Sequence, residues 1–105
     1  MSESKLEQDC TDLASQSGCR VRKVKYIGRR DAVDRQIHVP GWLSMTGHPF
    51  VWFVEFKSPN KKGDTSPGQD LEIKWLRDAG FAVHVVDDYD LFEKLFYLMT
   101  RQLRD

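Results

Sequence analysis

The feature that most constrains the fold is one apolar run that ends in a charged pair. Phe50 to Val54 are all apolar, and Glu55, Phe56 and Lys57 follow. A run of this kind predicts a strand buried on both faces, at the centre of a sheet covered on both sides. Because side chains alternate along a strand, Glu55 and Lys57 are expected on one face and Phe56 on the other.

The buried acid at the end of this run needs compensation. A carboxylate in an apolar strand is costly unless a cation, hydrogen bonds or a metal ion stabilises it. An ordinary ion pair between Glu55 and Lys57 at the end of the strand would be enough for an isolated pattern of this kind. A metal site is the alternative, and it requires further acids nearby.

Periodicity predicts helices on both sides of this central strand. Leu6, Cys10, Leu13 and Ala14 recur at helical spacing between Ser2 and Gln16, and Gly18 ends that helix. Partly exposed strands are expected over residues 20–27 and 35–39, and a buried strand over 81–86. With a helix after Ser66 and another after Asp88, the order is α-β-β-β-α-β-α, an α/β (α+β) fold around a mixed central sheet.

The two later helices have clear starts and apolar faces. Ser66, Pro67 and Gln69 match an N-cap, a first-turn proline and the third position of a capping box. Asp88 is placed to cap the last helix. The helix after Ser66 is expected to bury Leu71, Trp75, Leu76 and Ala79. The helix after Asp88 is expected to bury Leu91, Phe92, Leu95, Phe96, Met99 and Leu103. Trp42 is then the one tryptophan outside the expected core, and the candidate for stacking on a base.

Size and composition indicate one domain over residues 1–105, with 40% hydrophobic and 30% charged residues. No apolar stretch is long enough to span a membrane and no secretory signal is evident, so a cytoplasmic location without membrane contact is expected. Cys10 and Cys19 have no metal-binding spacing and are expected to be reduced thiols. The three histidines likewise share no ligand spacing.

The net charge of zero excludes recognition of nucleic acid by overall basicity. The charges are nevertheless unevenly distributed, because residues 20–30 hold six basic residues and no acid. Such a segment can meet phosphates locally, since salt limits the field to about 10 Å. A solvated strand with an outer face of Arg and Lys explains the segment about as well.

Two more acids are placed to join Glu55. Asp34 directly precedes the expected strand 35–39, in a turn that could bring its carboxylate beside Glu55. Glu7 lies on the apolar side of the first helix and is expected to face the sheet, whereas Glu3 is nearer the helix end. Converging carboxylates repel one another, and a hard divalent cation relieves that repulsion. For either helix acid, a favourable charge near a helix N-terminus is an equally good explanation.

The motifs together resemble a known family. Glu7, Gly28-Arg-Arg, Asp34, Val-Glu55-Phe-Lys57, Ser66-Pro-x-Gln69 and Leu76-x-x-x-Gly80 are similar in order and spacing to the VRR-NUC family of the PD-(D/E)XK nuclease superfamily. The resemblance covers about nine-tenths of the chain and implies a restriction-endonuclease-like core. One departure is Asp31-Ala-Val-Asp34, where relatives commonly have Gly-Val-Pro-Asp.

The resemblance also implies a set of site residues. It assigns a catalytic Mg²⁺ or Mn²⁺ to Asp34, Glu55, the backbone carbonyl of Phe56 and the helix acid Glu7. Lys57 would orient the attacking water or stabilise the transition state, and Gln69 would orient Lys57, water or a phosphate; the capping box explains Gln69 equally well. The residues expected to contact DNA are Lys23, Lys25, Arg29, Arg30, Lys61 and Lys62.

The activity expected from this resemblance is metal-dependent endonucleolytic cleavage of branched DNA, above all four-way (Holliday) junctions. Stand-alone members of this size resemble phage or bacterial proteins that act as homodimers, because paired cuts need two active sites. The alternatives are a flap or nicking nuclease, a catalytically impaired DNA-binding module of the same fold, and a small interaction protein with no nucleic-acid role.

Overall fold

A computed structural model describes residues 2–23, 33, 35–58 and 65–101. The elements follow the predicted order, with helix α1 (Glu3–Gln16), strands β1 (Arg20–Lys23), β2 (Arg35–Val39) and β3 (Phe50–Phe56), helix α2 (Pro67–Asp78), strand β4 (Ala82–Val86) and helix α3 (Tyr89–Met99). The described strands form one sheet in the order β1-β2-β3-β4. Pairing is antiparallel from β1 to β3 and parallel between β3 and β4, so the predicted mixed sheet is confirmed.

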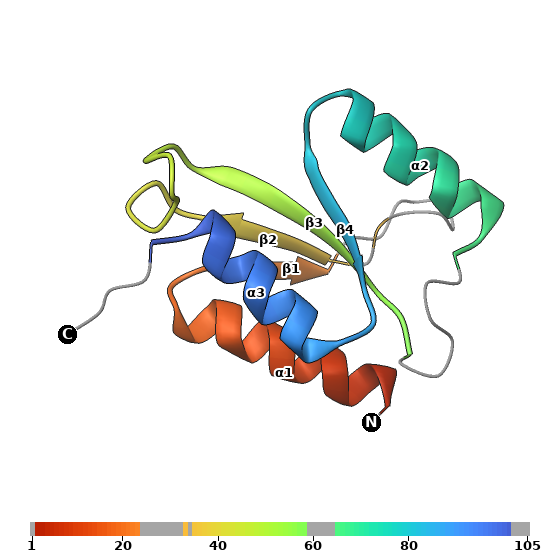
Figure 1. The fold of residues 1–105 in the computed structure, drawn as a ribbon, viewed down its shortest axis with the longest axis horizontal. Coiled ribbons are helices and arrows are strands. Elements are labelled where there is room, and N and C mark those ends of the chain that lie inside the picture. Colours follow the sequence, from red (N-terminus) through yellow and green to blue (C-terminus); the bar gives the residue numbers. More distant parts are fainter. Residues whose placement is uncertain (1, 24–32, 34, 59–64, 102–105) are drawn as a thin grey trace.

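Two apolar cores flank the sheet, as the alternation along β3 predicts. Trp52, Val54 and Phe56 face one core with α1 and α3, while Phe53 faces the other with α2. Figure 1 shows α1 and α3 on one side of the sheet and α2 on the other. Covering both faces makes β3 an inner strand and explains its continuous apolar run.

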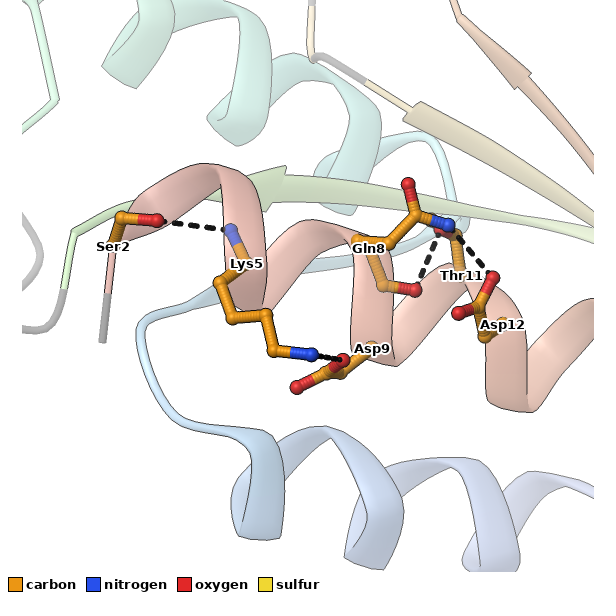
Figure 2. A network of polar contacts seen from close by, with 6 residues as sticks. All are labelled: Ser2, Lys5, Gln8, Asp9, Thr11 and Asp12. Atoms are coloured by element: carbon orange, nitrogen blue, oxygen red, sulfur yellow. Dashed lines mark hydrogen bonds and ion pairs between the residues drawn. The ribbon is translucent and has the colours of Figure 1, made fainter.

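Polar side chains on the outer face of helix α1 form hydrogen bonds within the helix itself (Figure 2). The Ser2 hydroxyl accepts a hydrogen bond from the backbone N–H of Lys5 at 3.1 Å, which caps the helix. One turn apart, Lys5 Nζ bonds Asp9 at 2.9 Å and Gln8 Nε2 bonds Asp12 at 2.7 Å. The inner face is left to Leu6, Cys10 and Ala14, all buried as predicted.

Helix α2 packs in an orientation that differs from the prediction. Its buried residues are Ile73 and Leu76, whereas Leu71 is 70% and Trp75 62% exposed. Ala79 is exposed as well. The inner face is therefore rotated relative to the predicted one, because Ile73 packs with Leu76 against Phe53 and Val83 and Trp75 does not. The ring of Trp75 instead stacks on Phe81 at the surface.

Helix α3 buries the centre of its predicted face. Phe92 and Phe96 are fully buried, Leu95 and Met99 are partly buried, and Leu91 is exposed. Leu103 lies outside the described residues. Asp88 occupies the N-cap position as expected, but its side chain makes no capping hydrogen bond.

Both cysteines are free and buried. Burial, with smaller effects from Asp9 and Asp88, raises the pKa of the Cys10 thiol to about 12, and burial raises the pKa of Cys19 to about 11. Such thiols are inert core residues, because the thiolate is the reactive form. None of the helices in the described ranges is long and apolar enough to cross a membrane.

A partly buried polar pair links β3 to β4 and makes stability depend on pH. Trp52 Nε1 donates to His84 Nδ1 at 2.9 Å, which requires a neutral ring. Burial, and then the charge of Arg77, lowers the pKa of His84 below its ordinary 6.5. The unfolded chain therefore binds more protons than the folded chain as the pH falls below about 6.5, and this contribution to stability is lost on acidification.

We expect the free energy of unfolding to fall between about pH 7.5 and about pH 5. Urea denaturation at both values measures the fall. His84→Asn keeps an acceptor for Trp52 and does not titrate, so its loss over the same interval should be smaller. An equal loss in both proteins would show that His84 does not contribute.

Candidate functional site

The central strand presents an ion pair at its carboxyl end. Lys57 Nζ lies 3.3 Å from Glu55 Oε2, and the two side chains are 18% and 2% exposed. The backbone N–H of Lys57 donates to the carbonyl of Val86 at 2.9 Å, which extends the pairing of β3 with β4 beyond Phe56. The extended backbone puts Glu55 and Lys57 on one face and Phe56 in the opposite core, as the sequence predicts.

Gln69 joins this pair from the first turn of α2. Its Oε1 accepts from Lys57 Nζ at 3.2 Å and from the backbone N–H of Ser66 at 3.2 Å. The Ser66 hydroxyl in turn accepts from the backbone N–H of Gln69 at 3.1 Å, which completes the predicted capping box. The two explanations for Gln69 are thus compatible, because one oxygen serves both the helix cap and the lysine.

Glu7 lies on the other face of the sheet. Its Oε1 accepts from Arg35 Nε at 2.6 Å, and both side chains are partly buried. Arg35 and Ile37 are two residues apart on β2 and therefore share a face, and Ile37 faces the core of α1 and α3. Glu7 faces the sheet as predicted, but the described structure does not bring it together with Glu55.

Arg35 is the polar partner that the sequence reasoning missed. The alternation of side chains along a strand was a signal for it. If Asp34 is expected on the face of Glu55, the next residue, Arg35, is expected on the face of α1. Glu7 faces the sheet from α1, so its carboxylate is the acid that this arginine can reach. Its charge compensates a partly buried carboxylate.

The other predicted site residues are only partly described. Lys23 is exposed at the end of β1 and pairs with Arg35, so it lies toward the α1 face and away from Glu55. Asp34 lies outside the described residues, as do five of the six predicted DNA contacts, namely Lys25, Arg29, Arg30, Lys61 and Lys62. Trp42 is 61% exposed and covers Gly18, where an added Cβ would lie 2.5 Å from its ring.

Among the described residues, the Glu55 carboxylate has the chemistry of a ligand for a hard cation. Its two oxygens lie in an apolar setting, where a negative charge needs a positive charge nearby. Lys57 supplies part of that positive charge. Within the described ranges no three His, Cys, Asp or Glu side chains gather closely enough to hold a metal ion. A complete site would therefore need a carboxylate from outside those ranges.

No protein-family model and no curated protein matches the sequence. A solved structure described as a VRR_NUC domain is similar, with a TM-score of 0.74 and 28% sequence identity over 89% of this chain and 91% of that one. The shared fold and the motif spacing both support the resemblance of this chain to the VRR-NUC domain family.

Proposed function

We propose that the chain is a divalent-metal-dependent endodeoxyribonuclease that acts on branched DNA, with the four-way junction as its main substrate. The observation that carries the proposal is the buried carboxylate of Glu55 beside Lys57 and Gln69, on a VRR-NUC fold. A nearly inaccessible acid held next to a lysine is costly for stability and useful for phosphodiester hydrolysis.

The proposed metal ligands are Asp34, Glu55 and the backbone carbonyl of Phe56. Arg35 and Val54 are paired across β2 and β3, and they are the chain neighbours of Asp34 and Glu55. When bound, Mg²⁺ or Mn²⁺ would supply Lewis acidity toward the scissile phosphate and a lowered pKa for an attacking water.

The chain's own residues have separate tasks in this proposal. Glu55 holds its oxygens in a fixed direction, because β3 is paired on both sides and its carboxylate is almost inaccessible. The Lys57 ammonium lies beside that carboxylate, where it can orient water or neutralise charge that develops on the phosphate. Gln69 fixes the ammonium from α2 and so limits the positions it can take.

Paired cuts in a junction would require two copies of this site, and we propose a homodimer for that reason. The large side chains Phe92 and Phe96 of α3 fill the core of the chain itself and are not available to a partner. Leu91 and Leu98 remain exposed on the same helix. They are candidates for the contact between copies.

The proposal is tested by incubating the protein with labelled four-way junction, flap and linear duplex DNA in Mg²⁺, Mn²⁺ or EDTA. Metal-dependent cutting of the junction in preference to the other substrates is expected. Preference for the flap would favour the alternative flap or nicking activity. Binding without cutting in either metal would contradict the nuclease proposal and indicate a binding module.

Gln69 offers a test of how Lys57 is positioned. Gln69→Met removes the acceptor of both Lys57 and the helix cap, whereas Ser66→Ala removes a capping bond and leaves Oε1 beside Lys57. Both should lower stability by about 1 kcal/mol. We expect Gln69→Met to lower kcat a further tenfold or so, in the range of a lost supporting hydrogen bond.

Melting temperatures and cleavage rates of the two variants decide the matter. Equal rates at equal stability would reduce Gln69 to a capping residue. Gln69→Glu is the conservative arm, because glutamate also closes a capping box; it should keep the stability while its charge beside Lys57 lowers the rate.

A further inference from the structure

The β1 and β2 half of the sheet is strongly basic although the whole chain is neutral. These two strands contain Arg20, Arg22, Lys23, Arg35 and His38, and no acidic residue. Such a concentration of charge attracts anions within about a Debye length, whatever the net charge of the molecule.

The strand register divides these residues between the two faces. Arg20 pairs with His38, which pairs with Val51, and this row crosses three strands. Arg22, Gln36 and Phe53 form the next row. Neighbouring residues in a row share a face of the sheet, so Arg20 and Arg22 lie on the face of Phe53.

This face is the one that carries Glu55 and Lys57. Phe53 and Glu55 are two residues apart on β3 and therefore point to the same side. Arg20 and Arg22 are both exposed, and neither forms an ion pair with a residue in the described part of the chain. Helix α2 packs its buried residues over Phe53 and Val83, toward the opposite edge of the sheet.

The first row also borders a hollow. Arg20 and His38 line a depression of about 480 Å³ together with Pro40, Pro49 and Phe50. The carboxamide oxygen of Gln36 accepts from His38 Nε2 at 3.1 Å, which fixes the imidazole between the two rows. A hollow with an arginine, a histidine and apolar walls fits a sugar-phosphate unit.

The spacing of the rows suits a nucleic-acid backbone. Two residues along a strand span about 7 Å, so the rows of Arg20 and Arg22 are separated by this distance, and Glu55 lies one such step further. A DNA strand carries one phosphate per ~3.4 Å of helix axis, so each step corresponds to about two phosphates.

We propose that Arg20, Arg22 and His38 form a phosphate-binding track on this face, which directs the DNA backbone toward Glu55 and Lys57. The choice of DNA as the ligand rests on the proposed function. The track names the surface that would bind this substrate. It lies on the face of the sheet opposite to Lys23 and to the ion pair of Glu7 with Arg35.

The test measures binding to fluorescently labelled duplex and junction DNA in EDTA, across about 50 to 200 mM salt. Arg20→Gln/Arg22→Gln should weaken binding on the order of 10- to 100-fold and reduce the slope of log affinity against log salt by about 2, one unit per lost phosphate contact. His38→Ala should cause a smaller loss. Lys74→Gln/Lys94→Gln is the matched control, because it removes two exposed charges from α2 and α3.

Melting curves confirm that the variants fold, and Arg20→Lys/Arg22→Lys should restore most of the salt dependence. The track is refuted if the double arginine variant binds like the lysine control, even when the wild type binds and cuts DNA. If the wild type binds through the arginines but never cuts, the track stands and the nuclease proposal fails. If the wild type does not bind DNA, both are wrong.

Discussion

Replacing Glu55 with glutamine is expected to lower the rate of metal-dependent junction cleavage by about 10³-fold or more, the effect of losing several kcal/mol of transition-state stabilisation. The carboxylate is 2% exposed and lies on an inner strand, so the sheet fixes the position of its oxygens. Glutamine has nearly the same shape and is neutral, which leaves the packing of β3 intact.

Two further measurements separate a lost ligand from a lost fold. In EDTA, Glu55→Gln should melt within a few degrees of the wild type, because it removes a buried charge without leaving a cavity. Mn²⁺ should raise the melting temperature of the wild type, by mass action, and not that of the variant. Glu93→Gln, on α3, is the matched control and should behave like the wild type in all three assays.

The prediction fails if Glu55→Gln retains more than about a tenth of the cleavage rate, since a lost metal ligand costs far more. It also fails if Mn²⁺ stabilises the variant as strongly as the wild type. Either result would make Glu55 the acid of a structural ion pair.

Replacing Lys57 with methionine is the second large change. The variant keeps the apolar stem and removes the ammonium that lies 3.3 Å from Glu55 and 3.2 Å from Gln69. We expect cleavage to fall by about 10²- to 10³-fold, the usual effect of removing one group that stabilises transition-state charge. DNA binding in EDTA should change much less, since one phosphate contact at most is lost.

Stability and activity should separate in this variant. Without metal, removing one partner of an almost inaccessible carboxylate should cost about 1–3 kcal/mol. Excess Mn²⁺ should recover part of this stability by supplying another positive charge, while cleavage stays low. Lys74→Met, on an exposed lysine that bonds Asp78 one turn away, should change neither property.

An unchanged cleavage rate in Lys57→Met would overturn the catalytic role of the lysine. Cleavage that recovers together with stability in excess Mn²⁺ would show that the lysine serves only to hold Glu55. Urea denaturation and single-turnover cleavage at matched metal concentrations distinguish these outcomes.

Local chemistry determined much of this protein directly. The capping box at Ser66 and Gln69 depends on residues three apart in the chain, and the structure reproduces it in full. Alternation along β3 placed Glu55 with Lys57 and separated both from Phe56, because side-chain direction in a strand is a local property. The element order follows from the same periodicities and is confirmed throughout the described residues.

The orientation of α2 was decided by packing between distant segments. Leu71, Trp75 and Leu76 form an acceptable apolar stripe by periodicity, but Ile73 and Leu76 fit the space over Phe53 and Val83. A helix with apolar residues on two sides has two possible inner faces, and only the shape of the opposing sheet selects one.

The tertiary structure also decided which polar groups meet. Lys57 and Gln69 are twelve residues apart, Glu7 and Arg35 twenty-eight, and both contacts depend on how the helices lie against the sheet. The basic segment was evident in the sequence, but the register of β1 with β2 assigns Arg20 and Arg22 to the face of Glu55. Residue types and periods are read along the chain, whereas partners across a sheet are fixed by register and packing, which involve the whole fold.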